Sequence, residues 1–399
     1  MSKILIWNKN LPLKNVGGPS GYLYNIYSYL EKTPNSQISF YSEVLKVSEN
    51  DSCEQGLKSK LKRCGIRFPS FIRKIKCLHN HLTRRLKLTP QEITLLEKYE
   101  YVHFHTFIEA RAYIEDIRKV VPHIKVILTT HTPEPYCDEY CNTVGISWIF
   151  NIPILREMCI KKETQCIDDV DYIMLPVPQV KEVYTTKSPL FEQAFLRAEN
   201  KTFYVPTAII NSVETKFENY LGKFELGDSL RVCYVGRHCA VKGYNFLKDI
   251  ATSAFEKKID VTFIIGGKQD GISKLANDKW IELGWVNTNN LLQEIDVFIL
   301  PNQQTYYDLI LLEVIRSGKP VLLTSTGGNK YFHKFTDTGL FFCDYGDVDQ
   351  ACKILMELLL AKKKKVLSLY GEKNRKLFEQ TSTLPIYIET YLCEVNKLK

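Results

Sequence analysis

The sequence is typical of a globular protein of two or three domains. It has 399 residues, of which 45% are hydrophobic and 25% are charged, so each domain can bury a full core. No apolar run approaches the roughly 18 residues that a membrane span requires, and the amino terminus has no signal-peptide pattern. Twelve scattered cysteines favour reduced thiols over disulfides. We therefore expect a cytoplasmic protein.

The first predicted strand, residues 3–7, leads into a glycine-rich turn and then an apolar helix, residues 22–30. Gly17 and Gly18 lie in this turn, so exposed backbone N–H groups at the start of the helix are suited to receive phosphate. A turn that only requires glycine explains the same residues. The pattern also differs from the GxGxxG of dinucleotide-binding proteins, so it does not predict a dinucleotide.

Residues 55–90 carry eleven Lys or Arg and no Asp or Glu. Removing these eleven charges from the formal +8 leaves −3, so the positive charge of the chain is concentrated here. Apolar residues are interleaved with the basic ones, some at helical spacing, which describes a basic amphipathic surface element. Such an element is suited to bind an anionic membrane surface. A solvated surface segment or a nucleic-acid-binding segment would have the same charge pattern. We expect the membrane surface as the partner and no nucleic acid, because no zinc finger or RNP-like motif is present.

Short apolar strands alternate with helical stretches along the chain. Near-continuous apolar strands of this kind predict parallel sheets that helices cover on both faces. The stretch 206–229 lacks a strong strand and is a natural linker, so the sequence predicts two doubly wound domains, in which ligands bind at the carboxyl ends of the strands. The predicted strands are residues 3–7, 101–104, 125–129, 172–175 and 203–205 in the first half and 231–235, 261–265, 281–283, 297–300, 321–323 and 339–342 in the second.

Histidines follow two of the strands in the first half. His103 and His105 lie at the end of one strand, and a structural role explains them well. His131 follows the next strand, where an imidazole can donate a hydrogen bond to a phosphate or a sugar hydroxyl. The nearby Cys137 and Cys141 have no second cysteine pair to complete a tetrahedral set, so we expect no metal site.

In the second half, the strand 231–235 runs into a loop that begins with Gly236 and ends at a helix. Arg237 and Lys242 lie five residues apart on this loop. The pair suits a diphosphate, because arginine offers a planar fork and lysine a point charge. A solvated loop would carry the same residues. The GxxxxGK[ST] pattern is absent, which excludes a P-loop.

Glu313 lies within an almost wholly apolar helical stretch, residues 309–315. Burial of an unpaired carboxylate is costly, so Glu313 requires a partner. Asp308 is a suitable N-cap of this helix, and Gly318 lies where a C′ glycine belongs. The carboxylate of Glu313 pairs either with Arg316, three residues further on, or with a ligand.

Together these motifs resemble the GT-B glycosyltransferases of family 4, also called glycosyl transferases group 1. The resemblance rests mainly on GRHCAVKG at 236–243 and on residues 301–321. It implies an α/β fold of the GT-B type, with two Rossmann-like doubly wound parallel-sheet domains that face one another across a cleft. The order of the other pieces agrees over nearly the whole chain: the Gly17-Gly18 turn, VHFH at 102–105, THTPE at 130–134, YVP at 204–206, ELGWV at 282–286 and the last helical stretch at 384–398.

The resemblance also implies the domain boundaries. The expected division is 1–206 for an N-terminal acceptor-binding domain with the basic excursion 55–90, 207–229 for the linker, 230–381 for a C-terminal nucleotide-sugar-binding domain, and 382–399 for a terminal helix that returns to the N-terminal domain.

Site roles follow from the resemblance as well. Arg237 and Lys242 would hold the diphosphate and stabilise the leaving group, a kind of stabilisation that is often the largest catalytic term. Glu313 would bind the ribose hydroxyls, and His131 would reach the sugar or phosphate from the opposite domain as a third catalytic residue. The other expected nucleotide-sugar contacts are Gly17, Gly18 and Gly236 near the phosphates, Trp285 and Val286 along the base, and Thr305, Tyr307, Asp308 and Leu309 near the sugar and β-phosphate.

The implied activity is a retaining, metal-independent transfer of a hexose-type sugar from a nucleotide-diphosphate sugar, with a UDP-sugar favoured and no cofactor. The acceptor would be a glycan or lipid-linked glycan in cell-surface polysaccharide or glycoconjugate synthesis, and the enzyme would lie peripherally at the inner face of the cell membrane.

One departure from the family pattern leaves alternatives open. The family commonly has a second glutamate eight positions before Glu313, where this chain has Thr305. Asp308 is a candidate for the missing carboxylate. A non-catalytic GT-B partner subunit, a GT-B sugar-nucleotide epimerase and a phosphorylase therefore stand as alternatives.

Overall fold

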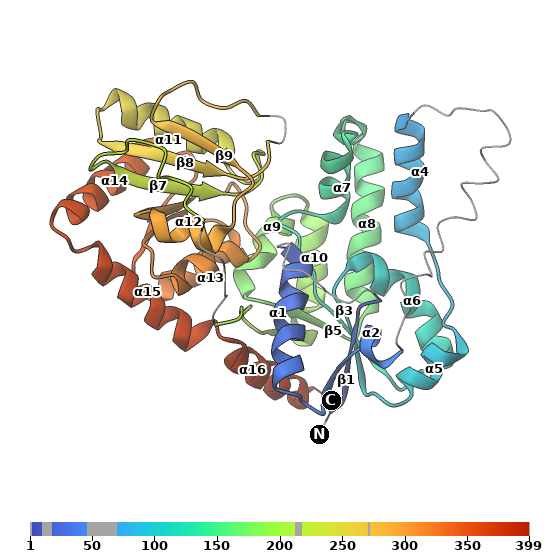
Figure 1. Ribbon diagram of the computed structural model, residues 1–399. Coiled ribbons are helices and arrows are strands. Elements are labelled where there is room, and N and C mark those ends of the chain that lie inside the picture. The colour runs from blue at the N-terminus through green and yellow to red at the C-terminus, as the bar shows by residue number, and fades with distance from the viewer. Residues whose placement is uncertain (1, 10–17, 46–69, 212–217, 270–271, 399) are drawn as a thin grey trace.

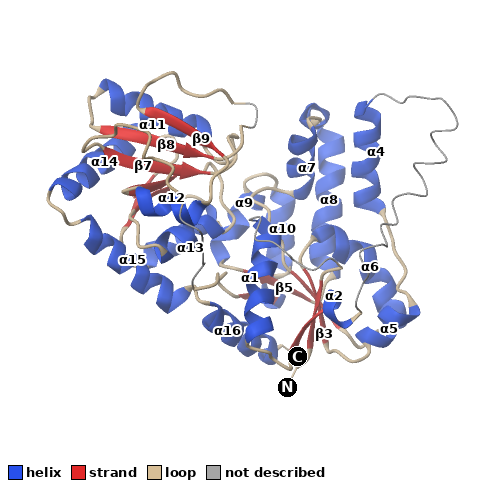
Figure 2. Ribbon diagram, viewed as in Figure 1, coloured by secondary structure: helices blue, strands red, loops and turns tan. Residues whose placement is uncertain are grey.

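The computed structural model of the chain describes residues 2–9, 18–45, 70–211, 218–269 and 272–398. It contains two six-stranded sheets, each flanked by helices, as Figure 2 shows. The strand orders are β2-β1-β3-β4-β5-β6 and β12-β11-β10-β7-β8-β9, and every pairing is parallel. The predicted α/β fold with two doubly wound parallel sheets is confirmed.

The first sheet forms an N-terminal domain. One of its strands, the three-residue edge strand β2, was not predicted, because so short a segment carries no recognisable period. The strands are β1 (Ile4–Trp7), β2 (Ile38–Phe40), β3 (Tyr101–Phe104), β4 (Lys125–Leu128), β5 (Tyr172–Leu175) and β6 (Thr202–Tyr204). The helices are α1 (Gly18–Lys32), α2 (Tyr41–Val44), α4 (Ser70–Thr83), α5 (Pro90–Leu96), α6 (Phe107–Val120), α7 (Tyr136–Val144), α8 (Pro153–Asp169), α9 (Glu182–Thr185) and α10 (Pro189–Arg197), with short 3-10 helices η1 (Ser147–Asn151), η2 (Pro178–Lys181) and η3 (Glu199–Lys201).

The second sheet forms a C-terminal domain. Its strand β8 is buried at every position, which explains why the sequence shows a continuous apolar run there instead of an alternation. The strands are β7 (Leu230–Val235), β8 (Val261–Gly266), β9 (Trp280–Gly284), β10 (Val297–Leu300), β11 (Val321–Thr324) and β12 (Leu340–Cys343). The helices are α11 (Tyr244–Glu256), α12 (Thr288–Glu294), α13 (Leu309–Arg316), η4 (Gly327–Lys334), α14 (Val348–Lys363) and α15 (Leu367–Thr381).

The last helix, α16 (Leu384–Lys397), leaves the C-terminal domain and packs beside α1 of the N-terminal domain (Figure 1). Both ends of the chain therefore lie at the base of that domain. The two connections between the domains meet one another, because the backbone N–H of Ile209 donates to the carbonyl of Ser382 at 3.1 Å and Ile209 pairs with Thr383. We call this contact the crossing.

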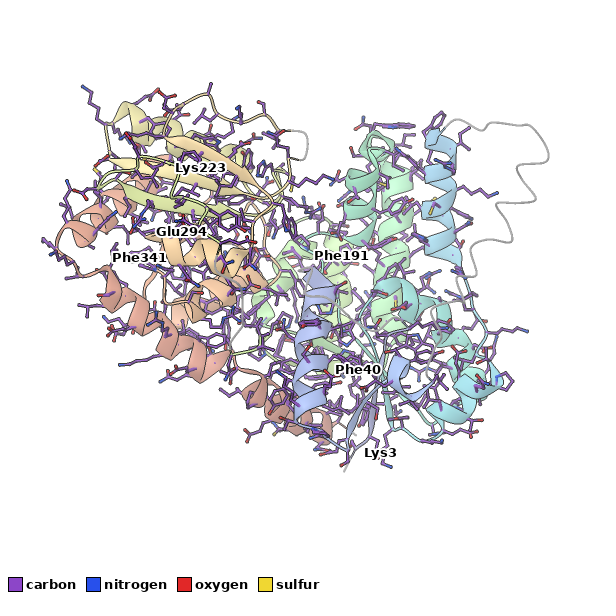
Figure 3. All side chains as sticks on the ribbon, in the orientation of Figure 1. Lys3, Phe40, Phe191, Lys223, Glu294 and Phe341 are labelled. Atoms are coloured by element: carbon purple, nitrogen blue, oxygen red, sulfur yellow. The ribbon has the colours of Figure 1, made fainter. Side chains whose placement is uncertain are left out.

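One apolar core cluster includes buried residues of both domains, and each domain has a further cluster on the other face of its sheet. Figure 3 shows side chains projecting from both domains. The side chains of Phe40 and Phe191 are almost completely buried in the N-terminal domain. In the residues that the structure describes, no helix has both the length and the apolar character needed to cross a bilayer.

Part of the basic segment falls outside the described residues, namely 55–69. The rest begins with α4, whose buried face carries Leu78 and Leu82. Figure 1 shows α4, α7 and α8 standing beside one another at the edge of the N-terminal domain, and these helices are in contact.

Candidate functional site

The loop from β7 to α11 carries the two predicted cations, and a glycine determines its path. Gly243 has a φ of +69°, and a side chain there would place its Cβ only 1.7 Å from the carbonyl oxygen of Pro301. Only glycine fits such a position. It brings the end of the loop against the carboxyl end of β10, directly before the segment that leads into α13.

A charged contact joins this loop to α13. The ammonium Nζ of Lys242 lies 2.7 Å from Oδ1 of Asp308, and both side chains are largely buried. The second oxygen, Oδ2, accepts hydrogen bonds from Asn302 Nδ2 at 2.5 Å and from Thr305 Oγ1 at 3.1 Å. Burial alone would raise the pKa of the Asp308 carboxyl, but the charge of Lys242 and these hydrogen bonds outweigh it and lower that pKa. Asp308 is thus a fixed anion.

Asp308 occupies the N-cap position of α13, as predicted, but its side chain does not cap the helix. The carboxylate is turned toward Lys242 and Asn302 instead. Because the N-cap side chain is engaged elsewhere, it leaves the first backbone N–H groups of α13 available, at the positive end of the helix dipole. The helix ends at Arg316 with Ser317 as its C-cap, and Gly318 follows with a φ of +68°, as expected for C′.

Glu313 lies one turn into α13 and is partly buried. Burial raises the pKa of its carboxyl, and the charge of Arg316 only partly offsets this effect. The guanidinium of Arg316 donates to the carbonyl of Ile210 at 2.8 Å and to Asn289 Oδ1 at 2.5 Å. The described residues contain no ion pair between Glu313 and Arg316. The intrahelical alternative therefore does not satisfy the carboxylate.

The N-terminal domain contributes His131 to the same region. Its ring makes an edge contact with Tyr306, which immediately follows Thr305, with centroids 6.3 Å apart. On its other side the ring stacks on His105, and the two nitrogens His105 Nδ1 and His131 Nε2 are 3.0 Å apart. Burial lowers the pKa of His131 to about 3, so the imidazole is neutral.

The cations of the C-terminal domain also affect the pKa values of acidic side chains in the N-terminal domain. Burial raises the pKa of Glu134 and of Glu139, while the charge of Arg237 lowers both. Lys242 acts on Glu139 in the same way. Arg237 itself is exposed. The structure therefore brings the β7–α11 loop close to the segment that follows His131.

The two domains touch through a pair of glycines at the start of η4. A Cβ on Gly327 would meet the carbonyl of Thr305 at 2.0 Å, and a Cβ on Gly328 would meet the carbonyl of Tyr306 at 1.8 Å. The backbone N–H of Gly327 donates to Glu182 of the N-terminal domain at 3.2 Å. Absence of side chains at these two positions lets the segment before α13 lie at the domain boundary.

The other predicted site residues are placed as follows. Thr305 is completely buried, so it positions Asp308 and presents no surface to a ligand. The ring of Tyr307 packs against Phe332 at 5.7 Å. Gly18 is exposed with a φ of +56°, and Gly17 lies outside the described residues. Gly236 donates its N–H to Gly266, Leu309 is partly buried at the start of α13, Trp285 is 84% exposed, and Val286 is buried against Gly266.

Asn302 is a site residue that sequence reasoning missed. It is completely buried and donates from Nδ2 to both Thr305 and Asp308, each at 2.5 Å. Its position two residues after the apolar strand β10 was the available signal, because polar residues at strand carboxyl ends line ligand sites in such sheets. Within the described part of the chain, no three His, Cys, Asp or Glu side chains are grouped so as to hold a metal ion.

Comparison with known proteins identifies the C-terminal domain. Residues 229–361 match the model of the family described as glycosyl transferases group 1. This domain belongs to that family. The expected likeness to glycosyl transferases group 1 is confirmed, and the matched segment, which carries Arg237, Lys242, Asp308 and Glu313, is a glycosyltransferase domain. No curated protein matches the chain at a significant level.

Solved structures extend the likeness to the whole chain. The complex of Anabaena HepE with UDP and glucose has a TM-score of 0.60 at 12% identity, over 100% of both chains. Sucrose-phosphate synthase from Thermosynechococcus elongatus has a TM-score of 0.64 at 13% identity, over 99% of both chains. The lipopolysaccharide outer core galactosyltransferase WaaB has a TM-score of 0.58 at 13% identity, over 100% of both chains. These likenesses confirm the GT-B fold predicted from sequence.

Proposed function

We propose that this chain is a retaining, metal-independent glycosyltransferase that moves a hexose-type sugar from a nucleotide-diphosphate sugar to a glycan or lipid-linked glycan. The observation that carries the proposal is the contact between Lys242 and Asp308 at 2.7 Å. It brings the two motif segments of the group 1 domain to one place. The contact between Tyr306 and His131 adds the N-terminal domain to that place.

The charges of the C-terminal face suit the leaving group. Departure of the sugar leaves negative charge on the diphosphate, and preorganised cations stabilise such charge most when they are partly shielded from water. Arg237 and Lys242 supply two positive charges, and the first N–H groups of α13 supply a helix N-terminus. In this proposal these groups take the place that a metal ion has in other transferases.

The ribose is the proposed partner of Glu313. Its carboxylate is partly buried with a raised pKa, and hydroxyl groups of a ribose would donate the hydrogen bonds that the folded chain does not supply. Trp285, exposed at the end of β9, is placed to cover a base. A uracil base is favoured because the Anabaena HepE structure is a complex with UDP and glucose.

Asp308 is the proposed replacement for the carboxylate that the family pattern places at Thr305. Two of the groups that hold it, Asn302 and Thr305, are completely buried. A carboxylate accepts about four hydrogen bonds in all, so Asp308 retains capacity for a sugar hydroxyl. The direct test of the proposed activity is product analysis with purified full-length chain, UDP-hexoses and lipid-linked glycan acceptors, with and without EDTA.

The expected result is acceptor-dependent release of UDP, a glycoside with the anomeric configuration of the donor, and no effect of EDTA. Loss of turnover in EDTA would overturn the metal-independent part. An isomerised nucleotide sugar without any glycoside would identify an epimerase, and release of a sugar phosphate in the presence of phosphate would identify a phosphorylase. Binding of UDP without turnover of any nucleotide sugar would favour a partner subunit.

The second part of the proposal concerns the acceptor. We propose that the chain binds peripherally to the anionic inner face of the cell membrane. Its acceptor would then belong to cell-surface polysaccharide or glycoconjugate synthesis. Support comes from the tip formed by α4, η1 and the start of α8, where the rings of Phe71 and Trp148 lie 6.0 Å apart. Large apolar side chains are exposed there, namely Phe71, Ile72, Trp148, Ile152, Ile154 and Met158. Arg73 and Lys76 are exposed basic residues of α4 itself, and Arg84, Arg85 and Lys87 are exposed in the segment that follows the helix.

Liposome co-sedimentation tests this placement. Replacement of Arg73, Lys76, Arg84 and Lys87 by Gln should abolish binding to vesicles that contain phosphatidylserine, because each basic residue near the surface contributes about 1 kcal/mol. The matched control replaces four exposed lysines of the C-terminal domain, Lys353, Lys363, Lys364 and Lys376. Equal loss in both variants, or in neither, would contradict docking through α4.

A further inference from the structure

Three histidines lie together beneath the site and form part of a buried polar network. The rings of His103 and His105 are 4.1 Å apart, and His105 stacks in turn on His131. Burial lowers the pKa of all three imidazoles, that of His103 to about 3. Each ring is therefore neutral, with a hydrogen on one nitrogen and a lone pair on the other. Which nitrogen carries the hydrogen follows from the donors and acceptors around each ring.

The first ring is fixed by its two neighbours. The hydroxyl of Thr129 donates to the carbonyl of Met174 at 3.0 Å, which uses its only proton. Its contact with His103 Nε2 at 2.8 Å therefore requires that Nε2 carries the hydrogen and donates. The other nitrogen, Nδ1, then accepts from the hydroxyl of Tyr391 at 2.8 Å. His103 is thus the Nε2–H tautomer, and it ties helix α16 to the sheet.

The second ring has a less complete set of partners. Nδ1 of His105 lies 3.0 Å from Nε2 of His131, whereas Nε2 of His105 is buried and has no hydrogen-bond partner in the described part of the chain. If Nε2 carried the hydrogen, a buried donor would be left unpaired. If Nδ1 carries it, only a lone pair is left unpaired. Orphaned buried N–H groups are the rarer of the two in folded proteins.

We propose that His105 is a positioning residue that donates its Nδ1–H to Nε2 of His131 and so fixes His131 as the Nδ1–H tautomer. His131 then presents a hydrogen-bond donor to the sugar or phosphate, and has no lone pair with which to act as a general base. The inference rests on the proposed function for the identity of the ligand. The tautomer itself depends only on the contacts within the N-terminal domain.

The stacked histidines have different functions in the proposed reaction: His105 orients His131, and His131 contacts the ligand. Nε2 of His131 is occupied by His105, so the ring is held in a single orientation against Tyr22 and Tyr306. Nδ1 of His131 makes no hydrogen bond to any described residue. It is the nitrogen left for a hydroxyl or phosphate oxygen, and the proton that activates the acceptor has to be taken by another group.

Two variants of His105, Asn and Asp, have side chains of the same shape but differ in whether they can donate a hydrogen bond to His131. In His105→Asn the amide Nδ2 occupies the place of Nδ1 and still donates, whereas in His105→Asp the oxygen at that place only accepts. Histidine-labelled full-length chains would be examined by 15N NMR at pH 7.5, where protonated and unprotonated ring nitrogens have different shifts. The expected result is the Nδ1–H form of His131 in the wild type and in His105→Asn, and the loss of that form in His105→Asp.

Transfer assays on the same proteins give the second readout. We expect His105→Asn to keep kcat within about threefold of wild type and His105→Asp to lower it at least tenfold with little change in KM for the nucleotide sugar. If His105→Asp does not fold, His105→Leu removes the donor and should give a mixture of tautomers.

An Nε2–H form of His131 in the wild type would overturn the inference, and so would equal turnover of the Asn and Asp variants. If the chain transfers no sugar at all, the proposed function fails. The NMR result still decides the tautomer in that case, so the two failures are distinguishable.

Discussion

The two faces of the site differ in charge. The C-terminal face contains the cations Arg237 and Lys242, with the fixed anion Asp308 between buried amide and hydroxyl groups. The N-terminal face under His131 is built from neutral imidazoles and from tyrosine hydroxyls, such as Tyr391, whose pKa is raised by burial. Glu134 and Glu139 lie at its edge, close enough to feel the opposite cations.

This difference corresponds to the two parts of the proposed substrate. A nucleoside diphosphate carries its charge on the phosphates, and a sugar carries only hydroxyl groups. Hydrogen bonds between charged groups and an ionic ligand are stronger than those between neutral groups. Neutral donors and acceptors can bind a hydroxyl group without the large desolvation cost of a buried charge. Four changes test this partition, from the largest expected effect to the smallest.

Loss of a cation from the C-terminal face should have the largest effect. Lys242→Ala is expected to lower kcat/KM by about 100- to 1000-fold, or about 3 to 4 kcal/mol, because one preorganised charge is removed from the leaving diphosphate. Steady-state kinetics with a UDP-hexose measure it. The control is Lys257→Ala, which removes an exposed lysine paired with Asp349 at the surface. A loss of less than threefold for Lys242→Ala would contradict the charged role of this face.

The neutral face should respond to acid. The folded-state pKa of both His103 and His131 is about 3, below the value of about 6.5 in an unfolded chain. The unfolded state therefore binds more protons below pH 6.5, and stability falls as pH falls from there toward 3. From pH 7.5 to 5.5 the two histidines should cost about 3 kcal/mol of unfolding free energy, measured by urea denaturation. His103→Asn should flatten this slope, and the exposed His123→Asn should leave it unchanged.

The ribose contact should have an intermediate effect. Glu313→Gln is expected to weaken UDP binding about tenfold, because charge-assisted hydrogen bonds become neutral ones. The same change should raise the melting temperature of the ligand-free protein, since the ionised carboxylate is partly buried with a raised pKa. Calorimetric titration and thermal unfolding measure the two effects, with the exposed Glu357→Gln as the control. Weaker binding together with a lower melting temperature would indicate a structural role instead.

Asp308 should contribute the smallest effect to stability. Its pKa is lowered in the folded state, so its contribution is present above the unfolded value of about 3.9 and is lost as pH falls through the folded value. Asp308→Asn should lower the unfolding free energy by about 1 kcal/mol at pH 7, and the difference from wild type should shrink as pH falls below about 3.9. Asp349→Asn, at an exposed pair, should leave it nearly unchanged. A difference that grows as pH falls below about 3.9 would contradict this ionisation of Asp308.

The sequence was sufficient for the parallel sheets and for the motif segments, because strands such as β8 are buried on both faces and are bounded by polar loops. It was insufficient for β2, whose three residues pair along one edge only. The sequence also did not determine whether the carboxylate of Glu313 pairs with Arg316 or with a ligand. That choice depends on where Arg316 points, and Arg316 turns to Ile210, which is 106 positions away in the chain.

The contacts that assemble the site connect distant parts of the chain in the same way. Lys242 and Asp308 are 66 positions apart, and His103 and Tyr391 are 288 apart. No local pattern encodes such pairs, since each depends on how complete domains pack. Asn302 could have been predicted from the sequence, because it lies two residues after a strand of the predicted sheet. Its function as the amide that fixes Asp308 required the fold.

The crossing constrains how the molecule can move. Two separate chain segments link the domains, and two separate links would normally resist rotation. Here they meet at Ile209 and Ser382 and are joined by a backbone hydrogen bond of 3.1 Å. A rotation about that place stretches neither link, so it acts as a single pivot, and motion at the pivot is amplified with distance from it. We therefore expect a rotation between the domains to change the backbone torsions beside Ile209 and Ser382.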